Sequence, residues 1–284
     1  MPRIIVIAAA AVLLAGAAGA AAKGPSPGGK GIRLGVCDWT IGKAGDPAAL
    51  ELAGKLGLEG VQVSLNPEGG SLAMVRPELR RAFLEAAERT GVAIPSFAIG
   101  ALNDVPLKSD PRAEKWLGEG IGIARDMRVG VILVPFFGKG DLKGDAPGTE
   151  AVIQVLRRLA PAAEKAGVVL ALENTLSAGD NLKVLGRVGS PAVRVYYDVG
   201  NCQDYGYPVM DEIRLMGNRI VEFHAKDTKD LYGRGSMDFP AIRRAMEGIG
   251  YGGWFVLEGT KMPLGIEKSV GYDADYLRRV FSEN

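Results

Sequence analysis

Four residues whose side chains bind metal ions close four short apolar runs in the second half of the chain. They are Glu173 after 168–172, Asp198 after 195–197, His224 after 220–223 and Glu258 after 254–257. His224 is the only histidine in 284 residues, so a site that uses it must otherwise be built from other residue types. Two glutamates, one aspartate and one histidine form a mostly oxygen ligand set. Such a set favours Mn²⁺, our first expectation, or Mg²⁺, and it also accommodates Co²⁺ or Zn²⁺.

Each of these residues also has an ordinary explanation. An acidic residue at a strand end is more often a helix cap or an ion-pair partner than a metal ligand. The four, however, recur at intervals of about one strand and one helix. This regular recurrence favours one shared site over four unrelated caps.

The elements that position these residues alternate along the chain. Runs rich in valine and isoleucine alternate about eight times with stretches of helical period from Ile32 onward. We predict strands at 32–39, 60–65, 93–99, 131–137, 168–174, 193–199, 220–227 and 254–258. Helical patterns cover 76–89, 111–127, 149–166, 210–216, 239–248 and 273–281. Glycines suited to a left-handed helix cap precede several strands, at Gly57, Gly91, Gly130, Gly167 and Gly250.

This alternation predicts an α/β fold with a parallel sheet, and eight repeats indicate a single-domain (β/α)8 TIM barrel. A doubly wound open sheet is the alternative, but it normally carries a glycine-rich phosphate loop after its first strand, and 37–42 offers none. Barrel active sites lie at the carboxyl ends of the strands. Neighbouring strands lie about 4.8 Å apart, so side chains from four consecutive strands can converge on one ion.

The N-terminal segment has the pattern of an export signal. A basic start, a short apolar run and a tail of small residues indicate a secretory signal peptide over 1–22. A Pro/Gly linker follows at 23–31, and the barrel is expected over 32–284. We expect a periplasmic or secreted protein without stable membrane insertion after signal cleavage. An uncleaved membrane anchor is the alternative, although the apolar run is short for a span.

The net charge narrows the choice of partners. The formal charge is +1, so no bulk basic field recruits nucleic acid, and small or neutral partners are favoured.

Cys37 and Cys202 are the only cysteines. A chain of this size does not depend on a disulfide framework, and two ordinary thiols are expected.

Several short motifs resemble one known family. The signatures are Leu-Glu-Asn at 172–174, Tyr-Asp-Val-Gly-Asn at 197–201, Phe-His-Ala-Lys-Asp at 223–227, Gly-Arg-Gly at 233–235 and Leu-Glu-Gly at 257–259. They resemble the xylose-isomerase-like TIM-barrel superfamily of sugar phosphate isomerases and epimerases, which includes ketose 3-epimerases. The resemblance runs from Ile32 to the C-terminus and is strongest over 168–259.

The resemblance implies roles for individual residues. Glu173, Asp198, His224 and Glu258 would bind the metal, and Glu173 and Glu258 would exchange a proton on opposite faces of the carbon beside a ketose carbonyl. The metal would act as the Lewis acid. Arg234 matches a position that contacts substrate hydroxyls or phosphate. Asn201 stands where many sugar epimerases carry a histidine, a departure that also resembles some pentulose-phosphate epimerases.

Other polar and aromatic residues have two interpretations each. Lys226 and Asp227 either bind substrate or pair with each other. Trp39 and the phenylalanines at 136 and 137 either form an aromatic wall for a sugar or pack in the core. Gln62 and Asn174 are further hydrogen-bonding residues at strand ends.

These observations predict a metal-dependent sugar isomerase or epimerase that abstracts a proton next to the carbonyl of a ketose or keto-sugar. Export favours an unphosphorylated substrate. The same groups would serve a lyase or hydratase of 3-keto-glycosides, and a non-catalytic sugar-binding barrel is a third interpretation. Endonuclease IV shares the superfamily, but its zinc site needs several histidines. The resemblance also suggests a homo-oligomer.

Overall fold

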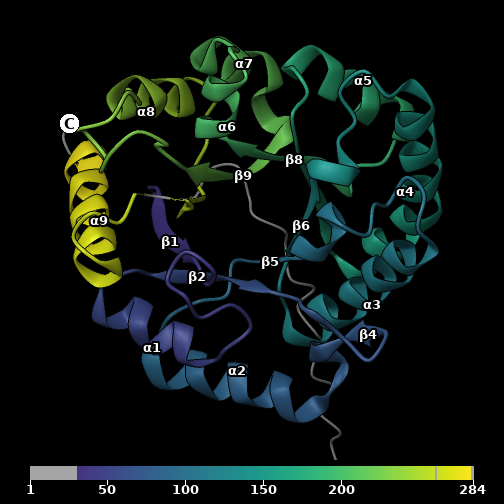
Figure 1. Ribbon diagram of the computed structural model, residues 1–284, viewed down its shortest axis with the longest axis horizontal. Helices are drawn as coiled ribbons and strands as arrows, with labels where there is room; N and C mark the ends of the chain where they lie inside the picture. The colour runs from purple at the N-terminus through teal and green to yellow at the C-terminus, as the bar shows by residue number, and fades with distance from the viewer. Residues whose placement is uncertain (1–30, 260, 283–284) are drawn as a thin grey trace, which may run out of the picture.

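The fold is a closed barrel of parallel strands surrounded by helices. The computed structural model describes residues 31–259 and 261–282. Figure 1 looks along the barrel and shows the helices arranged around it. Within the described residues, eight strands close the barrel in the order β1-β10-β9-β8-β7-β6-β5-β2. The predicted (β/α)8 barrel is therefore confirmed.

All eight predicted strands are present. They are β1 (Arg33–Cys37), β2 (Gly60–Ser64), β5 (Ser96–Ala98), β6 (Val131–Phe136), β7 (Val169–Asn174), β8 (Val193–Asp198), β9 (Ile220–Ala225) and β10 (Trp254–Leu257). A small antiparallel hairpin of β3 (Pro67–Glu68) and β4 (Ser71–Leu72) follows β2. The barrel strands pair in parallel, as a crossover helix between successive strands requires.

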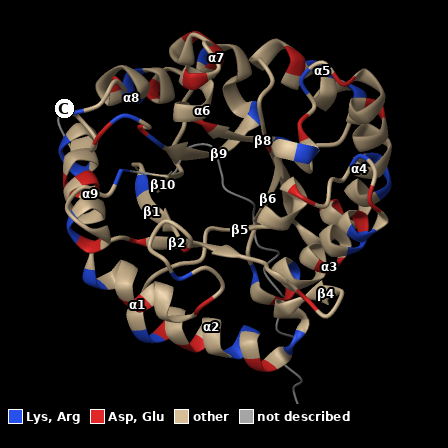
Figure 2. Cartoon of the chain, viewed as in Figure 1, with Lys and Arg blue, Asp and Glu red and all other residues tan. Residues whose placement is uncertain are grey.

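The helices cover the outside of the barrel. They are α1 (Ala48–Lys55), α2 (Pro77–Thr90), α3 (Pro111–Met127), α4 (Ala146–Ala166), α5 (Ala178–Val188), α6 (Val199–Asp204), α7 (Val209–Met216), α8 (Phe239–Gly248) and α9 (Ile266–Ser282). Short 3-10 turns occur at η1 (Ala73–Val75), η2 (Gly100–Asn103), η3 (Gly138–Gly140) and η4 (Gly217–Arg219). Basic and acidic residues are interspersed on these helices (Figure 2).

One expected helix cap lies elsewhere. Gly57, Gly91, Gly167 and Gly250 have the positive φ expected of them, whereas Gly130 is absent from the positive-φ glycines. Helix α3 ends at Met127, so the left-handed position falls on Arg128, with φ 57°. The cap is set by where the helix ends rather than by the nearest glycine.

Side chains alternate along each barrel strand between the layer under the helices and the inside of the barrel. Outward-facing apolar residues pack against the helices in one large core. Inside the barrel, a smaller apolar cluster is made of Ala98, Val131, Leu133, Ala171, Tyr196 and Val221. Because side chains alternate with period two, residues two positions apart share the inward face and lead up to the carboxyl end.

The predicted signal peptide at 1–22 and linker at 23–31 lie, apart from Gly31, outside the described residues. Among the helices that are described, none combines the length and the apolar character needed to cross a membrane. Cys37 and Cys202 are both buried free thiols, as expected.

Candidate active site

The four predicted metal ligands meet at the carboxyl end of the barrel. Each offers one ligand atom, and these atoms all lie within 4.8 Å of one another. His224 Nδ1 lies 3.0 Å from Glu173 Oε1 and 3.9 Å from Asp198 Oδ2. It also lies 4.0 Å from Glu258 Oε2. Strand pairing explains part of this geometry, because Asp198 on β8 is the register partner of His224 on β9.

Polar residues inside the barrel orient the histidine ring. His224 Nε2 lies 2.8 Å from Gln62 Oε1, and Gln62 Nε2 donates to Ser96 Oγ at 3.0 Å. An amide oxygen only accepts, so the imidazole proton belongs on Nε2. The lone pair of Nδ1 then faces the carboxylates. Such an outer partner is typical of histidines that bind metal.

One carboxylate oxygen of Asp198 accepts a hydrogen bond and the other accepts none. Its Oδ1 accepts from the backbone N–H of Asn201 at 2.8 Å, which caps helix α6. Its Oδ2 is buried without a hydrogen-bond partner among the described residues. The helix cap therefore fixes the carboxylate and directs its second oxygen into the cluster.

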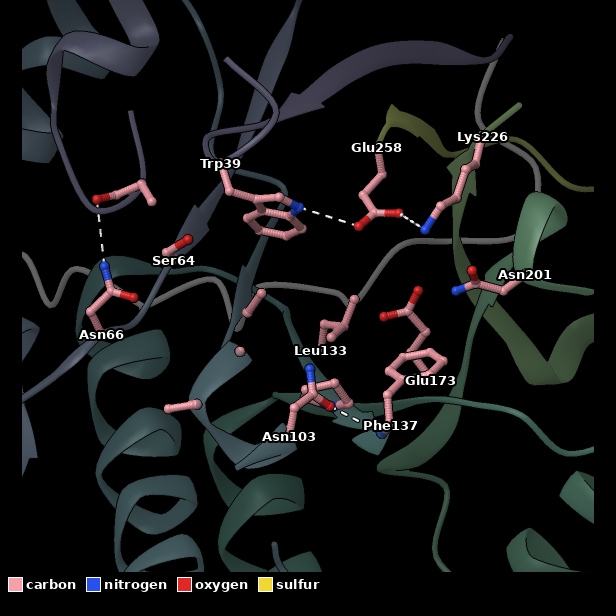
Figure 3. Close-up of a pocket in the computed structure, with 15 residues that line it drawn as sticks. Trp39, Ser64, Asn66, Asn103, Leu133, Phe137, Glu173, Asn201, Lys226 and Glu258 are labelled. Atoms are coloured by element: carbon pink, nitrogen blue, oxygen red, sulfur yellow. Dashed lines mark hydrogen bonds and ion pairs between the residues drawn. The ribbon is translucent and has the colours of Figure 1, made fainter. Parts of the chain in front are cut away.

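Glu258 is held at both oxygens. Trp39 Nε1 donates to Oε1 at 3.2 Å, and Lys226 Nζ donates to Oε2 at 2.6 Å (Figure 3). The same ammonium lies 3.3 Å from Asp198 Oδ2. Lys226 thus pairs with two predicted metal ligands rather than with its neighbour Asp227.

Two glycines make room for the Lys226 side chain. A Cβ at Gly200 would lie 2.7 Å from Lys226 Cγ, and one at Gly259 would lie 3.0 Å from Lys226 Cε. Gly259 also has a φ of 57°, where other residues are strained. These glycines belong to the Asp-Val-Gly-Asn and Leu-Glu-Gly motifs, so the motifs place the lysine as well as the carboxylates.

The buried charges shift one another's pKa values. Burial, reinforced by Glu258 and Glu173, raises the pKa of Asp198 to about 8, although Lys226 opposes the shift. Burial also acts to raise the pKa of Glu258, but His224 and Lys226 outweigh it and lower that pKa to about 2. For His224, burial lowers the pKa while Glu173 raises it, and the net direction is upward. The site favours bound positive charge.

The residues present fit a divalent ion. Two ligands bound at 2.0–2.2 Å to one ion are at most roughly 4.4 Å apart, so the spread of up to 4.8 Å needs only a small contraction. Asp198 Oδ2, which accepts no hydrogen bond although Lys226 Nζ lies 3.3 Å away, and the lone pair of His224 Nδ1 both face the place where the ion would lie. Glu173, Asp198, His224 and Glu258 are therefore the residues that would hold it.

A pocket of about 460 Å³ opens beside the cluster. Its wall includes Glu173, Asn201, Lys226 and Glu258 at the cluster, with Trp39 next to them (Figure 3). It continues past Leu133 and Phe137 to Asn66 and Asn103. The volume falls in the usual range for small-molecule sites, roughly 300–1,000 Å³.

The structure brings some of the predicted substrate-binding residues to this pocket and not others. Asn201, Lys226 and Trp39 line it, whereas Arg234 and Asp227 are not among the lining residues. Arg234 lies over the ring of Tyr272, 4.7 Å from its centroid, and donates to the Tyr272 hydroxyl. Asp227 is buried and accepts from the backbone N–H groups of Lys229 and Met237, so it organises its own loop.

Of the other predicted residues at strand ends, one lines the pocket and two do not. Phe137 lines the pocket, while Phe136 is buried in the core. Asn174 exchanges hydrogen bonds with Asn181 instead of facing the pocket.

Sequence reasoning missed three kinds of residue. Ser64 and Asn66 follow Gln62 at intervals of two and share its inward face, a signal that alternation along β2 carries. Asn103 lies in η2 and carried no signal of its own. Glu222, two residues before His224, is buried inside the barrel, and burial raises its pKa to about 7.

Comparison with known proteins identifies the family of the chain and supports its fold. Residues 50–280 match the family model described as xylose isomerase-like TIM barrel. A 2-epi-5-epi-valiolone 7-phosphate 2-epimerase from Actinoplanes sp. is 30% identical over 175 residues, 61% of this chain and 64% of that protein. The chain thus spans slightly less than two thirds of that relative.

An L-ribulose-5-phosphate 3-epimerase from Escherichia coli is 27% identical over 232 residues, 74% of this chain and 80% of that protein. The crystal structure of D-allulose 3-epimerase from Methylomonas sp. in complex with D-allulose has the same fold. Its TM-score is 0.73 at 15% identity, with 89% of this chain and 98% of that chain covered. The family model covers most of the chain, and the chain therefore belongs to the xylose isomerase-like TIM-barrel family.

Proposed function

We propose that this protein is a divalent-metal-dependent sugar epimerase or isomerase that abstracts a proton next to the carbonyl of a ketose or keto-sugar. One observation carries the proposal. Glu173 and Glu258 extend toward one another from two sides of the pocket, and both belong to the four-residue cluster that fits a metal ion (Figure 3). One carboxylate can remove a proton from one face of a substrate carbon, while the other, in its protonated form, delivers a proton to the opposite face.

The chain's own residues prepare this step. Trp39 and Lys226 hold both oxygens of Glu258, so the orientation of this carboxylate is set before a substrate arrives. Glu173 lines the pocket, and its Oε1 lies 3.0 Å from His224 Nδ1, so both groups face the same point of the cluster. A carboxylate is a weak base for a C–H group, with a reference pKa of about 4.3. When bound, a divalent ion supplies the Lewis acidity that makes such a proton removable.

The names of the relatives support sugar chemistry. Two of the matching curated proteins are named as epimerases of a valiolone 7-phosphate and of L-ribulose 5-phosphate. Mn²⁺ is the proposed ion because the ligand set is three carboxylates and one imidazole. We also propose that the protein is exported, on the N-terminal sequence pattern of residues 1–22.

Solvent deuterium exchange followed by NMR tests this function. The protein with Mn²⁺ is incubated in D₂O with a panel of ketoses and 3-keto-glycosides. We expect deuterium at the carbon beside the carbonyl, lost when the ion is chelated. An inverted product identifies an epimerase, and an eliminated product identifies a lyase instead. Sugar binding without exchange by any member would refute the proposal and identify a binding barrel.

A further inference from the structure

The charges of the pocket are confined to one end. Among the described residues that line it, the charged ones are Glu173, Lys226 and Glu258, all at the metal cluster. The one ammonium there is engaged, because Lys226 Nζ contacts Glu258 Oε2 at 2.6 Å and Asp198 Oδ2 at 3.3 Å. In the proposed function this end is occupied by the metal ion and the reacting part of the substrate, and the lining ammonium there is already paired with carboxylates.

The other end of the pocket, which we call the distal end, is uncharged. It is lined by small or apolar residues and three neutral polar ones, namely Ala98, Gly100, Ala101, Ser64, Asn66 and Asn103. Figure 3 shows Asn66 and Ser64 on the side of Trp39 away from Lys226. The nearby loop lysines outside the wall, Lys43 and Lys139, lie 3.6 Å and 3.9 Å from Asp46 and Asp104. As far as the described residues go, the wall of the distal end offers hydrogen bonds and apolar contact but no cation.

The pocket is also larger than one sugar ring. A CHOH group occupies about the volume of a water molecule, about 30 Å³, so a hexose fills roughly 180 Å³. The cavity measures about 460 Å³. A hexose held at the metal cluster would leave more than half of the space, including the distal end, for a second chemical group.

We infer that the substrate is an uncharged keto-glycoside, with the keto-sugar ring at the metal cluster and its aglycone or second sugar in the distal end. This inference rests on the proposed function and adds the substrate class to it. A phosphate placed in the distal end would lose water without gaining a positive partner, which is unfavourable. In this respect the chain differs from the two curated relatives described above, whose names specify phosphorylated substrates.

The test compares three forms of one keto-glucose in the deuterium-exchange assay. These are the methyl glycoside, the phenyl glycoside and the methyl glycoside 6-phosphate. We expect kcat/KM to be at least tenfold higher for the phenyl than for the methyl glycoside, and at least tenfold lower for the phosphate. Equal values for phenyl and methyl glycosides, or a preference for the phosphate, would overturn the inference.

Binding is measured separately, so that failure of the chemistry and failure of the substrate class are distinguishable. Calorimetry with Mn²⁺-loaded protein uses methyl glucoside, phenyl glucoside and glucose 6-phosphate, which lack the reactive ketone. Tighter binding of phenyl glucoside supports the inference even if no exchange occurs. Tightest binding of glucose 6-phosphate would overturn it even if exchange is fast.

Two variants locate the effect in the distal end. Ala101→Leu narrows this part of the pocket and should reduce the preference for phenyl over methyl glycoside at least fivefold. Ala162→Leu, on the exposed face of α4, is the matched control and should keep that preference.

A separate variant, Asn66→Lys, adds the missing cation and should raise the affinity for glucose 6-phosphate at least fivefold. Failure of Ala101→Leu to change the preference would place the aglycone elsewhere and refute the inference.

Discussion

Replacing Lys226 should tighten metal binding while impairing catalysis. The ammonium lies 2.6 Å from Glu258 Oε2 and 3.3 Å from Asp198 Oδ2, two of the oxygens that a metal ion would bind. An ion at about 2.1 Å from those oxygens would lie roughly 4–5 Å from Lys226 Nζ. Lys226 and the ion therefore repel each other and compete for the same oxygens.

The magnitude follows from Coulomb's law. A unit charge and a divalent ion at about 4.5 Å repel by roughly 2 kcal/mol with the dielectric constant of water and by roughly 7 kcal/mol at an effective value of 20. Relaxation of the freed Glu258 offsets part of this gain. We expect Lys226→Met to bind Mn²⁺ at least tenfold more tightly, a difference of about 1.4 kcal/mol or more. Its kcat should fall at least tenfold, because Glu258 loses the partner of Oε2.

The assay is calorimetric titration of chelator-treated protein with Mn²⁺ at constant pH. Lys229→Met is the matched control, because Lys229 is exposed and lies 3.7 Å from Asp204, outside the cluster. Its metal affinity should stay within twofold of the wild type, and thermal unfolding checks that both variants are folded. Weaker or unchanged Mn²⁺ binding by folded Lys226→Met would show that the lysine supports the metal site rather than competing with it.

Three further predictions concern the barrel interior and the two glutamates. Glu173→Gln and Glu258→Gln should each lower the deuterium-exchange rate at least a hundredfold while circular dichroism shows an intact fold; near-normal exchange in either would contradict the two-base mechanism. Gln62→Leu removes the partner of His224 Nε2 and should weaken Mn²⁺ binding about 10–100-fold, measured by the same titration; unchanged affinity would make this contact incidental. Burial raises the pKa of Glu222 from 4.5 to about 7, so the folded state binds this proton more tightly than the unfolded state, and stability is lost as pH rises from about 4.5 through 7. Urea unfolding should therefore give Glu222→Gln a free energy of unfolding up to about 3 kcal/mol higher than that of the wild type at pH 8, and nearly the same value at pH 4.5. An equal difference at both pH values would exclude this titration as the cause.

The candidate metal cluster was predictable because each of its members has a local signal. Glu173, Asp198, His224 and Glu258 end or follow apolar runs one strand–helix unit apart, and the barrel rule places strand ends together. The tautomer of His224 was not predictable, because Gln62 lies 162 positions away in the chain. Only barrel closure brings β2 across from β9.

The residues that line the pocket were harder to predict than the four candidate metal ligands. The Gly-Arg-Gly motif marked Arg234 for substrate, but its guanidinium lies over Tyr272, which comes from α9. Asp227 adjoins Lys226 in sequence, yet on a strand end consecutive side chains face opposite ways, so Lys226 reaches the pocket and Asp227 turns to its loop.

The sequence by itself determined the barrel and the four residues that form the candidate metal cluster. Strand and helix periodicity, together with strand-end residue types, are local properties of the chain. Tertiary structure alone decided that Lys226 pairs with Glu258 and Asp198, and that the pocket is charged at one end and neutral at the other. Those features depend on side chains brought together from different strands and loops, and their distances follow from barrel closure rather than from any local pattern.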